Sequence, residues 1–303
     1  MKEIIKITFL LTISCVIAAS AMGLTFMMTA KAKKHNHHMN VQNAMVSLLG
    51  FNAAHPAPSD LQFLNLYRYI VEDGDKKLLG YMIPVEAGGK ETYAMILVDL
   101  DGRFVEKLDV PISLEGAEEV ADRAKALEKV LAPRTFIYAD AYVVAKAGGK
   151  RLGYVLPGKF PGFRTFIHAL VAMDDNYTLL GLEIMEHEED AGLGAEITQE
   201  YFKNQFQGKS YERLKTLKVV KEPLPEEYKQ YLEKSKWTKG LFTQDQIDEI
   251  RKQYKDADIY AITASTISSR SVTNGVKGMA KKFAYRMDKL DSLLKQEHIQ
   301  TAF

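Results

Sequence analysis

Apolar residues dominate the start of the chain. From Ile7 to Ala30 no charged residue occurs over about 24 positions, which is enough for a helix to cross a hydrocarbon core of roughly 30 Å at about 1.5 Å per residue. The pattern predicts a membrane-spanning helix. A cleaved signal peptide with a small-residue site at Ala18–Ala21 is the alternative, but the apolar run continues to Met28, which favours a retained anchor.

Three further stretches have helical periodicity. Val41 to Phe51 predicts a short helix that Gly50 ends, and a proline-containing loop, His55–Asp60, follows it. Ala117 to Leu131 predicts a second helix. Its apolar face consists of Val120, Ala124, Leu127 and Leu131. A longer amphipathic helix is predicted near the C-terminus, with apolar positions at Val272, Val276, Met279, Phe283, Met287, Leu290 and Leu294.

An internal similarity relates the sequence before the predicted helix Ala117–Leu131 to the sequence after it. Leu79–Pro84 is echoed by Leu152–Pro157, and Tyr93–Asp101 by Ile167–Asp175, an offset of 73 to 74 residues. Each copy predicts a strand, a loop, a second apolar strand, an Asp-containing turn and a third strand. The third strands are Phe104–Val110 and Leu179–Met185. We expect a pair of small curved antiparallel sheets joined by the helix Ala117–Leu131; two unrelated hairpins with chance similarity are the alternative.

Composition and charge exclude several classes of protein. With 47% apolar and 10% aromatic residues the chain has ample core, and 40 basic against 39 acidic side chains leave a net charge of +1, so no bulk field recruits nucleic acid. The single cysteine, Cys15, excludes an internal disulfide, a Cys-x-x-Cys zinc site and an iron–sulfur cluster held by this chain alone. The histidines His35, His37 and His38 lack an acidic partner in the sequence and are interpreted as solvated, so no metal site is predicted.

A charged stretch between Glu222 and Lys255 interrupts the strand-like sequence. It contains Pro223, Pro225 and the only tryptophan, Trp237. The stretch is either an exposed insertion or a partner-binding element.

Hydroxyl side chains are concentrated between Ala261 and Ser271, directly before the predicted C-terminal helix. They are Thr263, Ser265, Thr266, Ser268, Ser269 and Ser271. Ser269 or Ser271 suits the N-cap of that helix. A helix N-terminus also attracts an anion, and Arg270 adds a positive charge. Capping and phosphate binding are compatible, so the residues alone do not separate them.

The segment Thr263-Ala264-Ser265-Thr266-Ile267-Ser268-Ser269 resembles a known flavinylation motif, (Ser/Thr)-Gly-Ala-Thr-x-(Ser/Thr). The motif belongs to the FMN-binding subunits of two ion pumps: RnfG of the Rnf complex and NqrC of the sodium-translocating NADH:quinone oxidoreductase. The resemblance implies covalent attachment of FMN to Thr266 through a phosphoester, and Asp258 could match the acid that often precedes the motif. Ala264 replaces the family glycine and Ser265 the alanine; the first change matters more, because alanine resists backbone conformations that glycine adopts.

A second block supports the same resemblance. His187-Glu188-Glu189-Asp190-Ala191-Gly192-Leu193-Gly194 and Gln205-Phe206-Gln207-Gly208-Lys209 are similar to the family segments His-x-Glu-Thr-Pro-Gly-Leu-Gly and Gln-Phe-x-Gly-Lys. Asp190-Ala191 in place of Thr-Pro makes the loop less rigid. Without the family, the block is typical of a surface turn; with it, Gly192 and Gly194 are expected to let backbone approach a planar ring. The predicted FMN-binding residues are Thr266, Thr263, Ser265, Ile267, Ser268, Arg270, His187, Glu188, Gly192, Leu193 and Gly194.

The resemblance implies an α+β protein with one N-terminal transmembrane helix and an extracytoplasmic FMN-binding domain of small antiparallel sheets flanked by helices. We expect an anchor at 1–34, an α+β half at 35–145, and the FMN-binding domain at 146–303 with its charged insertion near 222–255. Lysines flank the anchor on both sides, Lys2 and Lys6 before it and Lys31, Lys33 and Lys34 after it. Charge counting weakly places the large domain inside. The resemblance overrides that count and implies the periplasmic face of the inner membrane.

The function implied is electron relay through FMN within a membrane redox complex, which requires no acid–base dyad. The implied partners are the other subunits of the complex and a flavin transferase that uses FAD. Two alternatives stay open: a membrane-anchored structural or binding subunit that lost flavin when Gly-Ala became Ala264-Ser265, and a solitary extracytoplasmic flavoprotein outside any pump.

Overall fold

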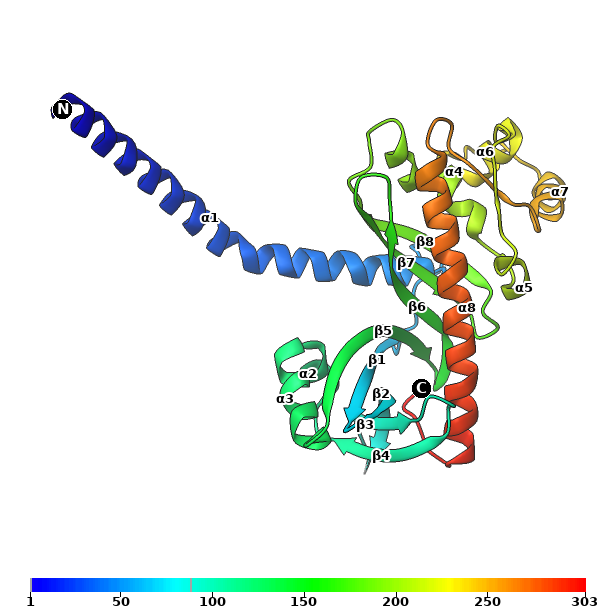
Figure 1. Cartoon of the computed structure of the whole chain (residues 1–303). Coiled ribbons are helices and arrows are strands. Elements are labelled where there is room, and N and C mark those ends of the chain that lie inside the picture. The colour runs from blue at the N-terminus through cyan, green and yellow to red at the C-terminus, as the bar shows by residue number, and fades with distance from the viewer. Residues whose placement is uncertain (1, 88) are drawn as a thin grey trace. The chain divides into compact units, whose positions relative to one another are not determined.

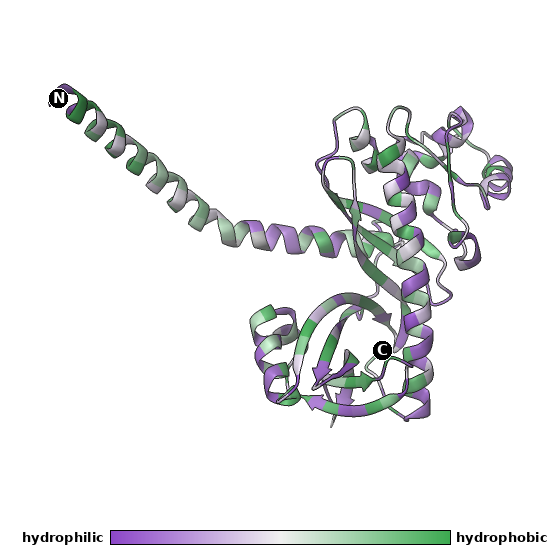
Figure 2. Ribbon diagram, viewed as in Figure 1, coloured by the Kyte–Doolittle hydropathy of each residue, from purple (hydrophilic) through white to green (hydrophobic). Residues whose placement is uncertain are grey.

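The N-terminal region is a single long helix. The structure, a computed structural model, describes residues 2–87 and 89–303, and the chain forms two compact units that divide after Ala44. Helix α1 (Lys2–Leu48) has an exposed apolar first half (Figure 2). It is long and apolar enough to cross a membrane, and a signal sequence has a similar length and composition. The short helix predicted at Val41–Phe51 is not separate: it is the end of α1, which stops before Gly50 takes a φ of +90°.

The second unit is built on one eight-stranded antiparallel sheet (Figure 1). Its strands are β1 (Gln62–Asp73), β2 (Lys76–Ala87), β3 (Lys90–Val98), β4 (Phe104–Val110), β5 (Thr135–Ala147), β6 (Lys150–Pro161), β7 (Phe166–Met173) and β8 (Leu179–Glu186). The strand order is β4-β3-β2-β1-β5-β6-β7-β8. Two four-stranded meanders therefore lie back to back, joined through their first strands.

The internal similarity corresponds to this duplicated topology. The echoed segments Leu79–Pro84 and Leu152–Pro157 lie in β2 and β6, the second strands of the two meanders, and the other echoed pair falls on β3 and β7. The predicted pair of separate sheets is corrected to one continuous sheet, because β1 pairs with β5 along its length, with Phe63 opposite Ala145 and Tyr67 opposite Ala141. The first strands β1 and β5 were not predicted.

One face of the first meander is covered by helices α2 (Leu114–Glu118) and α3 (Val120–Leu131). Leu127 and Leu131 pack there against strand residues such as Met82 and Tyr93. The predicted helix Ala117–Leu131 is broken at Glu119, where ψ is 118°. As a result Val120 is 69% exposed, against prediction.

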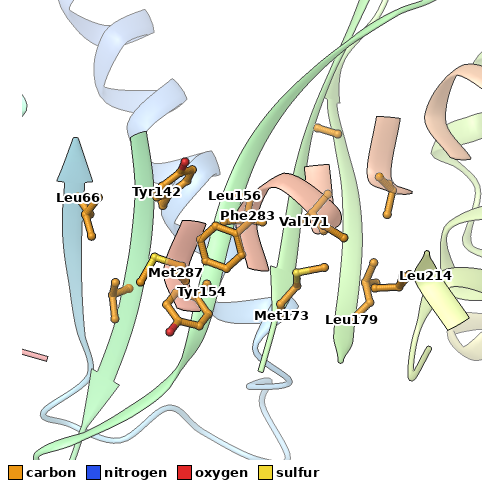
Figure 3. Close-up of a cluster of buried hydrophobic side chains, with 14 of the residues drawn as sticks. Leu66, Tyr142, Tyr154, Leu156, Val171, Met173, Leu179, Leu214, Phe283 and Met287 are labelled. Atoms are coloured by element: carbon orange, nitrogen blue, oxygen red, sulfur yellow. The ribbon is translucent and has the colours of Figure 1, made fainter. Parts of the chain in front are cut away.

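Helix α8 (Thr266–Gln296) packs on the opposite face of the sheet and contributes to a core shared by both meanders (Figures 1 and 3). The ring of Phe283 lies 5.0 Å from that of Tyr142 on β5 and 4.8 Å from that of Tyr154 on β6, measured between centroids. All seven predicted apolar positions lie in or against this core. The sheet therefore fixes α8 along much of its length.

Short elements connect β8 to α8. They are η1 (Gly194–Thr198), α4 (Glu200–Lys203), η2 (Asn204–Phe206), α5 (Tyr211–Leu214), β9 (Val219–Val220), α6 (Glu226–Leu232), η3 (Lys234–Lys236), α7 (Gln244–Tyr254) and β10 (Ile259–Tyr260). The charged stretch 222–255 is ordered around its own small apolar cluster, which includes Tyr228, Tyr231, Leu232 and Ile250. β9 and β10 form a separate parallel pair, and β10 directly precedes the hydroxyl-rich segment.

Candidate functional site

The hydroxyl-rich segment forms the first turn of α8 and the loop that enters it. The N-cap is Ser265 and the first helical residue is Thr266, so the predicted N-caps Ser269 and Ser271 lie inside the helix. The Ser269 hydroxyl accepts a hydrogen bond from the Ile262 N–H (3.0 Å) and donates one to the Ser265 carbonyl (2.9 Å). These two bonds tie the loop to the helix and fix the position of Thr266, which is half-buried.

Ala264 has the left-handed backbone conformation, with a φ of +62°. This is the position at which the flavinylation motif has glycine. A side chain with a Cβ costs roughly 1–2 kcal/mol in that conformation, whereas glycine adopts it freely. Alanine therefore takes the conformation that glycine favours, at an energetic cost that the bonds made by the following residues offset.

A buried carboxylate, Glu189, connects the glycine loop, residues 187–194, to the first turn of α8. Its Oε1 accepts a hydrogen bond from the Phe163 N–H (2.7 Å) and a longer one from the Arg164 N–H (3.3 Å). Its Oε2 accepts a hydrogen bond from the hydroxyl of Ser268. A Cβ at Gly194 would lie 2.7 Å from that Oε2, so glycine is required for this close approach.

The segment Gln205–Lys209 holds β10, the strand that leads to the hydroxyl-rich segment. The amide of Gln205 accepts from the Tyr260 N–H (2.7 Å) and donates to the Tyr260 carbonyl (3.3 Å), which anchors β10. The ammonium of Lys209 donates to the carbonyls of Ala257 (2.7 Å) and Lys255 (3.4 Å). Lys209 is almost completely buried, and this desolvation lowers its pKa to about 8.

Asp258 has a structural role on the approach to the same segment. Its carboxylate accepts a hydrogen bond from the Lys218 N–H (2.9 Å) and pairs with the guanidinium of Arg213. These bonds hold the start of β10 beside β9. Asp258 is absent from the pocket described next.

The helix start and the glycine loop enclose an open pocket of about 430 Å³. Its lining residues are Phe163, Glu189, Asp190, Leu193, Gly194, Ala264, Ser265, Thr266, Ile267 and Ser268. Phe163, Leu193 and Ile267 are between 44% and 58% exposed, so three large apolar side chains surround the opening. The guanidinium of Arg164 pairs with Asp190 at 2.6 Å at the same rim, and this hydrogen bond raises the pKa of Arg164.

The pocket brings together part of the predicted site. Ser265, Thr266, Ile267 and Ser268 line one wall, and Leu193 and Gly194 line the other. Gly192 takes a φ of +72° in the turn just before them. The other four predicted residues, Thr263, Arg270, His187 and Glu188, are outside the lining. His187 instead supports the loop, because its Nδ1 accepts a hydrogen bond from the Glu189 N–H at 3.2 Å.

Four lining residues were not predicted as site residues: Phe163, Glu189, Asp190 and Ala264, the last of which lies inside the segment that resembles the flavinylation motif. Glu189 lies in a run of three acidic residues, and nothing local distinguishes the buried one from its neighbours. Its place as the glutamate of the His-x-Glu family segment was the available signal. Phe163 lies in the β6–β7 turn and reaches the pocket only through the tertiary fold.

Residues 162–281 match the sequence model of the FMN-binding domain family. The match includes the glycine loop, the hydroxyl-rich segment and the first half of α8, and it begins one residue before Phe163. This part of the chain is therefore an FMN-binding domain of that family. The resemblance predicted from the two motifs is confirmed.

A curated relative is a component of a membrane redox complex. Over 136 residues the chain is 29% identical to the G component of the proton-translocating ferredoxin:NAD(+) oxidoreductase complex of Clostridium ljungdahlii. The alignment covers 45% of this chain and 56% of that protein, so the chain spans about half the length of the curated relative it matches.

Two solved structures are more distant. NqrC of Shewanella oneidensis is 18% identical with a TM-score of 0.34, covering 46% of this chain and 55% of that one. The equivalent component of the Na(+)-translocating NADH-quinone reductase of Parabacteroides distasonis is 20% identical with a TM-score of 0.32, covering 65% and 77%.

Proposed function

We propose that this chain is an electron-carrying subunit of a membrane redox complex and that it holds FMN covalently through a phosphoester to the Thr266 hydroxyl. The observation that carries the proposal is the position of Thr266. It is the first residue of a 31-residue helix and lines a pocket whose opposite wall is the glycine loop of an FMN-binding domain.

The residues present fit FMN. The free N–H groups at the start of α8 and its partial positive charge suit the phosphate, and Arg270 adds a full charge nearby on the same helix. The exposed apolar side chains Phe163, Leu193 and Ile267 suit a planar ring at the pocket opening. When bound, FMN supplies the redox chemistry; the protein's part is to hold it and to set its surroundings.

The chain's own groups keep Thr266 in place. Glu189 and Ser269 fix the two sides of the helix start, and Gln205 and Lys209 fix the strand that leads to it. A covalent link would prevent loss of the cofactor during repeated turnover. The ester would be made by a separate flavin transferase that moves FMN from FAD to the Thr266 hydroxyl, breaking the pyrophosphate bond of FAD and releasing AMP.

In-gel flavin fluorescence tests the attachment. The full-length chain is coexpressed with a flavin transferase, denatured and separated, and we expect a fluorescent band. Thr266→Ala should abolish the band, whereas Thr238→Ala, which alters an exposed hydroxyl outside both the motif and the pocket lining, should keep it. A band that persists in Thr266→Ala, or no band in the parent chain, would refute attachment at Thr266 and leave a subunit without covalent flavin as the better interpretation.

We further propose that α1 is retained as a membrane anchor and that residues 45–303 lie on the periplasmic side. The support is the exposed apolar half of α1 and the redox complex named for the relative. Protease added to intact spheroplasts should then cut the large unit, and digestion only after lysis would contradict this orientation. If the other complex subunits are recovered with the tagged chain from native membranes, the chain is a pump subunit. If the tagged chain is recovered without them, a solitary carrier is favoured.

A further inference from the structure

A second pocket lies in the 222–255 region, apart from the flavin pocket. It has a volume of about 370 Å³ and lies between α6, α7 and the turn that follows η2. It shares no lining residue with the pocket at Thr266. Cavities that hold small molecules typically begin at about this size.

The charge of this pocket is one-sided. Lys234, Arg251, Lys252 and Lys255 line it, and no carboxylate is among its lining residues. The carboxylates recorded as interacting with lining residues lie outside the pocket: Asp248 is 3.7 Å from Arg251, Glu200 interacts with Lys234, and Glu227 interacts with Tyr254. Within the described ranges neither Lys252 nor Lys255 forms an ion pair. Such a concentration of cations favours an anion.

The apolar side of the pocket is a parallel stack of tyrosine rings. Tyr228 and Tyr254 lie face to face, with centroids 3.9 Å apart and planes within 4°, and Tyr231 continues the stack on Tyr228 at 6.3 Å and 14°. Tyr228 and Tyr231 are buried, while Tyr254 ends the stack and is half-exposed. In the described part of the chain the only ring recorded against Tyr254 is that of Tyr228. One face of Tyr254 is therefore suited to a further planar ring.

We infer that this pocket binds an anionic compound that carries a planar ring, of the nucleotide class. Its ring stacks on Tyr254 and its anionic group lies among Lys252, Lys255 and Arg251. The cations and the stacked rings line the same cavity. The pocket as a whole therefore suits a ligand with both a ring and an anionic group better than a purely apolar or a purely ionic one.

The only tryptophan provides the readout. Trp237 packs against Tyr231, with ring centroids 5.8 Å apart, so a ligand in the pocket changes its surroundings. The full-length chain in detergent is titrated with AMP, with adenosine and with pyrophosphate, and tryptophan fluorescence is followed. We expect a saturable change with AMP, weakened by added salt, and at least tenfold weaker binding of both adenosine and pyrophosphate.

Two variant pairs locate the site. Lys252→Glu should weaken AMP binding by about tenfold or more, while Lys239→Glu, an exposed charge in the same region but outside the pocket, should not. Tyr254→Leu should weaken it and Tyr254→Phe should not, because the phenylalanine ring is retained. Circular dichroism confirms that each variant is folded.

Three results would overturn the inference. The first is no saturable change with AMP. The second is equal affinity for AMP and either partial ligand, since the ring or the charge would then be irrelevant. The third is the same loss of affinity in Lys239→Glu as in Lys252→Glu, since the effect would then be general electrostatics rather than this pocket.

Discussion

The two meanders share a topology and a repeated sequence, yet only the second leads to a site. After β4 the chain turns back as α2 and α3 and covers its own meander. After β8 it continues into the glycine loop, and the hydroxyl-rich segment returns to that loop about 70 residues later. The duplicated strands thus give the two halves of the sheet the same topology. The segment that follows each meander determines whether that half only packs in the core or also forms a pocket.

The covering helices differ in the same way. α3 is short and packs mainly on the first meander, with the Arg123 guanidinium 4.1 Å from the ring of Tyr67 on β1 and 5.8 Å from that of Tyr138 on β5. α8 has 31 residues, packs on both meanders and begins at the pocket. We therefore expect substitutions of core residues under α8 to affect the flavin site, and substitutions under α3 to affect stability without affecting that site.

The largest expected effect follows from this difference. Phe283→Ala removes a fully buried ring from the core under α8 and should lower the free energy of unfolding by about 4 kcal/mol. It should also lower the yield of covalent flavin, because α8 carries Thr266. Denaturant unfolding and in-gel fluorescence measure the two quantities.

Leu127→Ala is the matched change under α3, with an expected cost of about 3 kcal/mol. Its flavin yield should equal that of the parent chain at a temperature where both are folded. An equal loss of flavin in the two variants would contradict the separation between the two faces.

The next largest effect concerns the carboxylate that joins the loop to the helix. Glu189→Leu leaves the N–H groups of Phe163 and Arg164 and the hydroxyl of Ser268 without their acceptor, so we expect a loss of about 3 kcal/mol and little flavin attachment. The neighbour Glu188 is exposed, and Glu188→Leu should change neither quantity appreciably. Normal flavin yield in Glu189→Leu would show that the loop and helix are held by other contacts.

A pH effect is predicted for Lys209. Its pKa is lowered from 10.5 to about 8 in the folded chain, so the unfolded chain binds more protons between these values and stability rises with pH. Above about 10, tyrosines whose pKa is raised by burial, such as Tyr93, reverse the trend. From about pH 8 to about pH 10 the free energy of unfolding should increase by roughly 2 kcal/mol.

Lys209→Met provides the comparison, because it removes the titrating group and keeps much of the side-chain volume. The rise in stability with pH should disappear in this variant. A rise that persists would assign the effect to another group.

The smallest effect concerns Ala264. Ala264→Gly relieves the left-handed conformation but adds freedom to the unfolded chain, so we expect a gain of at most about 1 kcal/mol with flavin yield retained. Ala264→Val, with a branched side chain at the same φ, should lower both stability and yield. Equal thermal stability of the valine and glycine variants would show that this turn does not restrict the backbone.

Local patterns were sufficient to predict several elements. The strands predicted at Phe104–Val110 and Leu179–Met185 match β4 and β8, and the apolar face of α8 was also predicted, because alternation and helical spacing are carried by neighbouring residues. The break at Glu119 was not, since a single residue with a non-helical ψ leaves the apolar spacing around it intact.

Local sequence patterns do not predict which strands pair when the strands are far apart in the sequence. Nothing in β1 or β5 states that the two strands, some 70 residues apart, pair with each other, and this pairing merges the two predicted sheets into one. The site shows the same limit. Thr266 and Gly194 were recognised through family motifs, whereas Phe163 joins them only through a turn between strands, and the burial of Glu189 depends on three segments meeting.

The pairing of β1 with β5 also restricts how the protein can be shortened. The family match begins at Gly162, and the second meander resembles an independent unit. Removing residues 45–134 would expose the whole hydrogen-bonding edge of β5, together with buried side chains such as Val144, to solvent. An uncovered edge of that length is a template for intermolecular strand addition. Shortened chains that begin at β5 should therefore aggregate, and the intact sheet is the smallest soluble form of the flavin domain that we expect.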